Sequence, residues 1–107
     1  MKVALCTING RIAPKYYDDI ELLIVTIHNG IITERKLIAA EALNPDELCT
    51  LILYLKMDVI ICGGIIKSYQ KKLQDYSVQL IFNVIGNVDD VLRRFMEGQL
   101  QSGDVVK

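Results

Sequence analysis

The stretch that decides the fold is Asp58-Val59-Ile60-Ile61-Cys62-Gly63-Gly64-Ile65-Ile66. Its β-branched residues run on without polar alternation, which is typical of a strand buried on both faces of a sheet. The two glycines that follow permit a sharp turn into a helix and let main-chain N–H groups come close to a ligand. Because ligands of open α/β sheets bind at the carboxyl ends of strands, we predict the binding site at this turn.

The chain as a whole has the size and composition of a single domain. It contains 107 residues with a net charge of −1, and its basic residues form no stripe, so the electrostatic footprint of a nucleic-acid binder is missing. No apolar run reaches the roughly 18 residues that cross a bilayer, and residues 1–5 lack the layout of a signal peptide. We therefore expect a cytoplasmic protein without nucleic-acid or membrane partners. Its three cysteines, an odd number, indicate free thiols rather than a disulfide framework.

Local signals outside the opening stretch predict an alternation of strands and helices. Asn29-Gly30 is a strong hairpin signal. Asn44, followed by Pro45 and by Glu47, is typical of a capped helix start, and Asn87 caps a last helix that Gly98 ends. We predict strands over residues 2–7, 20–28, 31–39, 58–62 and 77–84, with helices after Asn44, Gly64 and Asn87. Residues 99–107 read as frayed.

Three blocks of the sequence, in order and with matching spacing, resemble one known family. They are residues 9–17 (Asn-Gly-Arg-Ile-Ala-Pro-Lys-Tyr-Tyr), residues 58–65, and residues 86–91 followed by Phe95 and Gly98. The chain is similar in these blocks to the dinitrogenase iron–molybdenum cofactor biosynthesis family (NifX/NafY-like, NifB C-terminal domain-like). The resemblance spans residues 2–103, nearly the whole chain.

The resemblance implies an α/β fold of the ribonuclease H-like type. That fold has three α/β/α layers and a mixed five-stranded sheet of order 3-2-1-4-5, in which strand 2 is antiparallel. It makes residues 1–103 one domain and leaves residues 104–107 as a frayed C-terminal tail. It also brings Cys6 and Cys62 near the carboxyl ends of adjacent parallel strands.

Candidate site residues gather at that edge of the implied sheet. Cys62 and Cys6 are the candidate metal ligands, because thiolates are the usual protein ligands of iron–sulfur clusters; both are also ordinary buried core residues in many proteins. The Gly63–Gly64 turn is predicted to offer N–H groups to an anion. Lys15, Tyr16 and Tyr17 are predicted to overhang the site; Lys15 stands where the family usually has a histidine. Cys49 reads as a packing residue, and His28 as a surface residue at the hairpin.

These residues favour binding over catalysis. Residues 3–7 hold no carboxylate, whereas a ribonuclease H-like nuclease needs clustered acids that hold two metal ions. The only histidine, His28, lies away from the cysteines, so no nucleophile–base pair can be built. We expect a non-enzymatic carrier of an iron–sulfur or iron–molybdenum cofactor precursor, exchanging this anionic cluster with donor and acceptor proteins, as a monomer or homodimer. The alternative is a diverged interaction or regulatory module that has lost cluster binding.

Overall fold

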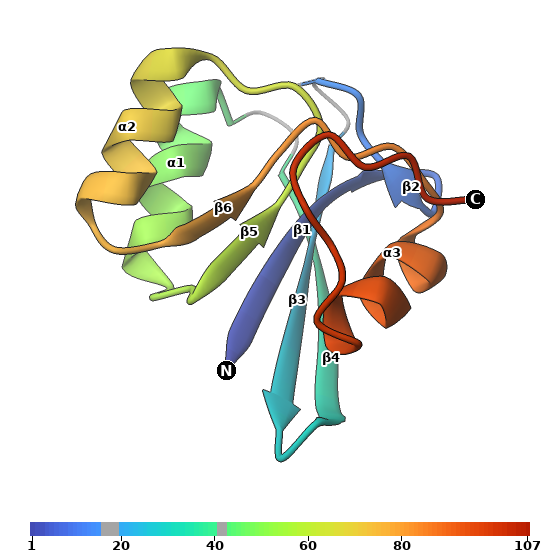
Figure 1. The fold of residues 1–107 in the computed structure, drawn as a ribbon. Coiled ribbons are helices and arrows are strands. Elements are labelled where there is room, and N and C mark those ends of the chain that lie inside the picture. Colours follow the sequence, from blue (N-terminus) through green and yellow to red (C-terminus); the bar gives the residue numbers. More distant parts are fainter. Residues whose placement is uncertain (16–19, 41–42) are drawn as a thin grey trace.

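Residues 2–8 form the central strand of a mixed sheet in the computed structural model, which describes residues 1–15, 20–40 and 43–107 (Figure 1). The described strands follow the order β4-β3-β1-β5-β6, and a short β2 also pairs with β1. Their bounds are β1 (Lys2–Ile8), β2 (Arg11–Ile12), β3 (Glu21–His28), β4 (Ile31–Ala39), β5 (Val59–Ile61) and β6 (Gln79–Ile81). Counted without β2, this is the expected order 3-2-1-4-5, and it is confirmed. β3 runs antiparallel to both neighbours, as expected, while β1, β5 and β6 are parallel.

The sheet has six strands where five were expected. The additional strand, β2, folds back onto Thr7 and Ile8 of β1. The turn between them is Asn9-Gly10, and both residues have positive φ angles, 52° and 77°. Such angles suit a tight hairpin and are accessible to asparagine and glycine. The Asn-Gly pair is itself a turn signal, but no sequence pattern marks the two residues of pairing that follow it.

The helices begin where the capping residues predict, apart from α2. They are α1 (Pro45–Tyr54), α2 (Lys67–Asp75) and α3 (Val88–Met96). Asn44 and Glu47 form a reciprocal capping box at α1, and the Asn87 side chain accepts a hydrogen bond from the Asp89 amide at α3. α2 has no capping side chain and starts three residues beyond Gly64, so the glycine turn does not lead straight into it. No helix in the described residues is both long and apolar enough to cross a membrane.

The helices divide the core into two clusters, one on each face of the sheet (Figure 1). α1 and α2 cover the face to which Ala4 and Cys6 point. α3 covers the opposite face, to which Val3 and Leu5 point. Successive residues of a strand face opposite sides, so the apolar run of β1 supplies both clusters. The sheet and the helices on its two faces thus form three α/β/α layers, with one core cluster between each pair of layers.

Two ends of elements differ from the sequence expectation. β6 is much shorter than residues 77–84, because Ser77 and Asn83 adopt positive φ angles of 61° and 56° that leave the extended region. The C-terminal tail is ordered rather than frayed. Ile85 donates to Asp104 O at 3.0 Å and accepts from the Val106 amide at 2.8 Å, and Val106 is buried. An isolated apolar pair at a chain end has no periodicity, so the sequence does not signal this docking.

Candidate functional site

A cavity of about 470 Å³ lies at the carboxyl ends of β1 and β5. α1 and α2 form its walls, and Ala13, Lys15 and residues 63–66 form its rim. Its volume lies within the range of small-molecule sites, roughly 300–1,000 Å³. The lining is mostly apolar, with Leu48, Ile52, Ile60 and Leu73 among its residues, and it includes all three cysteines of the chain. We call this cavity the thiol pocket.

Strand register brings Cys6 and Cys62 together. Leu5 of β1 lies opposite Ile61 of the parallel strand β5, so the next residues along are Cys6 and Cys62. Both belong to the cluster under α1 and α2, and both are less than 10% exposed. The expected placement of these two cysteines at the ends of adjacent parallel strands is therefore what the structure has.

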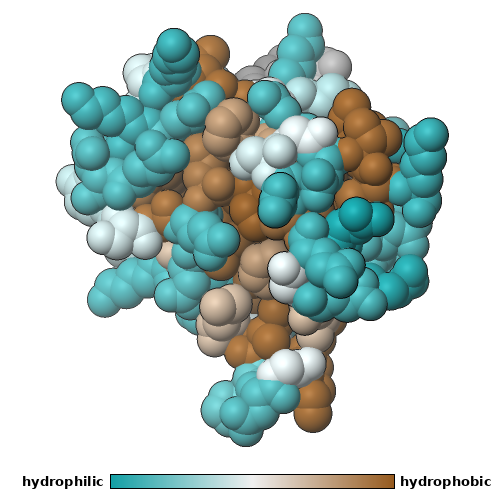
Figure 2. Space-filling model, in the orientation of Figure 1, coloured by the Kyte–Doolittle hydropathy of each residue, from teal (hydrophilic) through white to brown (hydrophobic). Residues whose placement is uncertain are grey.

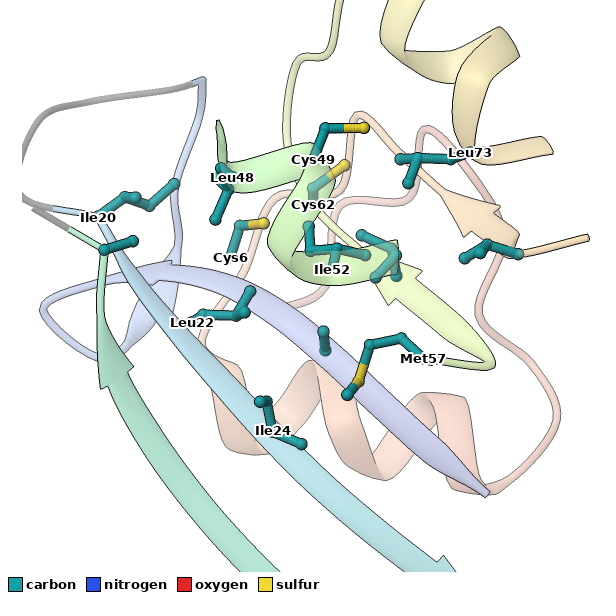
Figure 3. Packing of buried hydrophobic residues seen from close by; sticks show 14 of the residues in the cluster. Cys6, Ile20, Leu22, Ile24, Leu48, Cys49, Ile52, Met57, Cys62 and Leu73 are labelled. Carbon is teal, nitrogen blue, oxygen red and sulfur yellow. The ribbon is translucent and has the colours of Figure 1, made fainter. Parts of the chain in front are cut away.

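Cys49 joins them from α1, where the sequence had indicated only packing. It is 5% exposed and lines the thiol pocket. Figure 3 shows the sulfurs of Cys6, Cys49 and Cys62 at one end of the cluster, with Met57 at the other end. The stripe of Leu48 and Ile52 on α1 is wide enough to include Cys49, because a core-facing stripe spans more than 100° of a helix. An apolar stripe drawn wide enough to include Cys49 would have predicted that this cysteine faces the core.

Burial holds these thiols in the protonated form. It raises the pKa of Cys6 to about 12, and it raises the pKa of Cys62 further, with repulsion from Cys6 adding to the effect. Burial also raises the pKa of Cys49. The nearby Lys72 ammonium lowers this pKa, and the Asp46 carboxylate raises it further, so that the net change is upward. A ligand that needs thiolates must therefore displace protons from this pocket.

Residues 13–14 of the same chain pack directly against the Gly63–Gly64 turn. A Cβ on Gly63 would overlap the carbonyl oxygen of Ala13 and lie 2.7 Å from that of Pro14. The Gly64 amide donates to the Pro14 carbonyl at 2.6 Å. Gly63 is therefore required so that residues 13–14 can pack on the turn, whereas a Cβ on Gly64 would only be crowded, 3.1 Å from the Pro14 oxygen. The Gly64 N–H, expected to face an anion, is already used within the chain.

Of the three residues predicted to overhang the site, Lys15 lies among the described residues. Lys15 is exposed and lines the thiol pocket. Tyr16 and Tyr17 lie outside the described residues. Across the rim, a hydrogen bond to the Asp46 carboxylate raises the pKa of the Tyr69 hydroxyl, with partial burial adding to it. This bond links α2 to the first turn of α1.

The other candidate features lie away from the thiol pocket. His28 ends β3 beyond Thr26, which pairs with Lys2, so it lies at the opposite end of β1 from Cys6. A second hollow of about 530 Å³ lies on the α3 side, lined by polar and apolar residues that include Arg11, Glu21 and Asp89. It contains no cysteine. Within the described residues, no three His, Cys, Asp or Glu side chains converge closely enough to hold a single metal ion.

Comparison with solved structures gives full-length matches to this fold. The crystal structure of PH0822 matches with a TM-score of 0.85 at 15% identity, covering 95% of this chain and 94% of that one. The "putative dinitrogenase" MJ0327 of Methanocaldococcus jannaschii matches with a TM-score of 0.77 at 25% identity, covering 94% of this chain and 92% of that one. The "putative NifB protein" TM1290 of Thermotoga, of the DUF35 family, matches with a TM-score of 0.70 at 12% identity over 99% and 97% of the two chains.

In structure, the chain resembles the dinitrogenase iron–molybdenum cofactor biosynthesis family. The family resemblance expected from the sequence is thereby confirmed by structural similarity. The matches below 25% identity show the shared fold alone. No protein-family profile matches the sequence, and no curated protein is significantly similar to it.

Proposed function

We propose that this protein is a non-enzymatic carrier that binds an iron–sulfur cluster or an iron–molybdenum cofactor precursor in the thiol pocket. The observation that supports this proposal is the gathering of Cys6, Cys49 and Cys62 around one cavity. Soft thiolates are the protein ligands that iron–sulfur clusters take. A cluster has several coordination positions, so its thiolate ligands can come from side chains that do not converge on a single ion.

In this proposal the residues at the pocket divide the work of holding the cargo. Cys6 and Cys62 supply sulfur from the floor, at the strand ends, and Cys49 supplies it from α1. Lys15 brings a cationic residue to the rim, which favours an anionic cluster over a cationic one. Tyr16 and Tyr17 remain predicted as residues that close the pocket.

Reversible release follows from the protonation of the thiols. Binding must displace protons from groups whose pKa values burial has raised, so the affinity for the cargo falls as the pH is lowered. A carrier benefits from such weak retention, because it must give its cargo to an acceptor. The apolar walls, Leu48 and Leu73 among them, would keep water from the cargo.

The residues of the central strand fit a binding role better than a catalytic one. We infer a ribonuclease H-like classification from the strand order and the three layers, yet β1 carries no aspartate or glutamate. A nuclease of that type needs carboxylates that hold two metal ions. The described residues therefore offer no support for nuclease chemistry.

The test is cluster uptake by protein purified without oxygen. We expect protein supplied with ferric iron and sulfide to retain both in stoichiometric amounts and to show thiolate-to-iron absorption in the visible range. Cys62→Ser and Cys6→Ser should lose most of the iron, and Cys49→Ser should lose part of it. His28→Asn is the matched control, because His28 lies at the far end of the sheet and its loss should leave iron uptake unchanged. Colourless protein that also refuses a preformed cluster would overturn the carrier role.

A second candidate is an interaction or regulatory module that keeps the fold but binds no cluster. Two observations favour it: the pocket walls are apolar, and the Gly64 amide is bonded to Pro14 rather than open to a ligand. Such a module would give metal-free protein in the uptake test, and Cys62→Ser would leave its partner binding intact.

A further inference from the structure

The two edges of the sheet differ in how they end. β6 has only three residues, and at the next residue the C-terminal tail takes over: the Phe82 amide donates to the Ser102 hydroxyl, and the Gly103 amide donates to the Phe82 carbonyl. β4 has nine residues and, among the strands of the described residues, pairs with β3 alone. A long edge strand presents unpaired N–H and C=O groups to any chain that can add a strand.

The exposed middle of β4 has a self-complementary sequence. Residues 33–37 read Thr-Glu-Arg-Lys-Leu and are all exposed. Glu34 and Lys36 lie opposite Thr26 and Ile24 of β3, so both project on the face that carries α1 and α2. Arg35 lies opposite Val25 and projects on the α3 face. An acid and a base therefore flank one central residue on the same face of the sheet.

We propose that β4 pairs with β4 of a second copy of this chain, antiparallel, about a two-fold axis at Arg35. That axis places Glu34 of each copy directly opposite Lys36 of the other. A centre at Glu34 or at Lys36 would instead set like charges against each other. Directly opposed side chains in an antiparallel pair have Cβ atoms roughly 4.5–5.5 Å apart, close enough for both ion pairs to form.

The two central arginines do not oppose this arrangement strongly. Each Arg35 guanidinium is held by Asp89 of its own copy, with Nη1 and Oδ1 3.3 Å apart, so its charge is partly balanced before pairing. The same axis sets Leu37 against Thr33 of the second copy, and it covers Leu37, which is 56% exposed in one chain.

The register shift at Thr26–Ile27 limits how far the pairing extends. β4 carries one additional residue there, because Thr26 pairs with Glu34 while Ile27 pairs with Ile32. A bulge of this kind bends the strand and weakens pairing beyond it. The dimer therefore depends on residues 33–37, and it dissociates on dilution. Figure 2 shows apolar surface toward the β3–β4 hairpin, where Ile31 is 65% exposed and stays outside the paired segment.

The test is the mass of the metal-free protein in sedimentation equilibrium over a range of concentrations. The natural chain should change from monomer to dimer as the concentration rises. E34K and K36E should each raise the dimer dissociation constant about tenfold or more, because each turns two attractive pairs into two repulsive ones. K71E is the matched control, since Lys71 is an exposed lysine on α2, away from β4.

Mixing the two variants gives the decisive result. E34K has two basic residues at the pairing positions and K36E has two acidic ones. An equimolar mixture should therefore form a heterodimer at concentrations where each variant alone stays monomeric. The double variant E34K/K36E should dimerise like the natural chain. A natural chain that stays monomeric at every concentration, or a dimer that neither reversal affects, would overturn the proposal. Since Cys62→Ser leaves β4 untouched, it should dimerise normally, so this result stands apart from that of cluster uptake.

Discussion

The two faces of one sheet differ in the size of the side chains they bury. The cluster under α3 contains only valine, leucine and isoleucine among its buried residues. The cluster under α1 and α2 includes alanines and cysteines: Ala4, Cys6, Ala13, Ala40, Cys49 and Cys62. Close packing requires the side-chain volumes to fill the space between layers, and small residues leave part of it unfilled. The thiol pocket thus results from small side chains gathered at one end of one face.

The largest expected effect compares one leucine from each face. Leu92 on α3 is 1% exposed within the filled cluster, whereas Leu48 on α1 borders the thiol pocket. We expect Leu92→Ala to lower the free energy of unfolding by about 4 kcal/mol and Leu48→Ala by about 2.5 kcal/mol, because Leu48 already lacks partner atoms on the pocket side. Denaturant unfolding measures both values. Equal losses would mean that the pocket is filled in solution and that the two faces do not differ in packing.

A smaller effect tests how residues 13–14 close the pocket rim. A Cβ at Gly63 would overlap the Ala13 carbonyl oxygen, whereas a Cβ at Gly64 would lie 3.1 Å from the Pro14 oxygen. We expect Gly63→Ala to cost about 3 kcal/mol of stability and Gly64→Ala to cost about 1 kcal/mol. Thermal unfolding of the pair checks this order. Two variants of equal stability would show that residues 13–14 do not pack on the turn as they do in the structure.

The smallest effect uses the buried thiols of the α1–α2 face. The ordinary thiol pKa is 9.0, and burial raises the pKa of Cys6 to about 12 in the folded state. Above pH 9 the unfolded chain loses this proton while the folded chain keeps it, so stability falls with rising pH until pH 12. The expected loss is about 1.4 kcal/mol per pH unit for this thiol.

Cys6→Ala supplies the comparison for this pH dependence. Unfolding measured at pH 8 and at pH 10 should show a smaller fall for Cys6→Ala than for the natural chain, since the substitution removes one buried thiol while Cys49 and Cys62 remain in both proteins. An unchanged fall would mean that water reaches Cys6, and that the α1–α2 face is open more deeply than its burial indicates.

Much of the fold was predictable because its signals are local. The Asn29-Gly30 turn, the Asn44–Glu47 capping box and the Asn87 cap involve backbone groups within a few residues of the signal. The strand order came from the family resemblance, since no local signal says which strands become neighbours. β2 escaped prediction because its pairing with β1 after the Asn9-Gly10 turn is only two residues long, too short for a sequence pattern. The docked tail escaped because Val105 bridges to Ile85, which is distant in the chain.

The sequence by itself determined the order of the elements, their turns and caps, and the placement of Cys6 and Cys62 at strand ends, because strand alternation and short-range hydrogen bonds are encoded residue by residue. Only the tertiary structure decided that Cys49 borders the same pocket, that Gly63 is a glycine because Ala13 and Pro14 pack on it, and that Val106 is buried beside Gly86. Each of these depends on how closely two segments far apart in the chain approach, and that distance is fixed by the volumes packed between them.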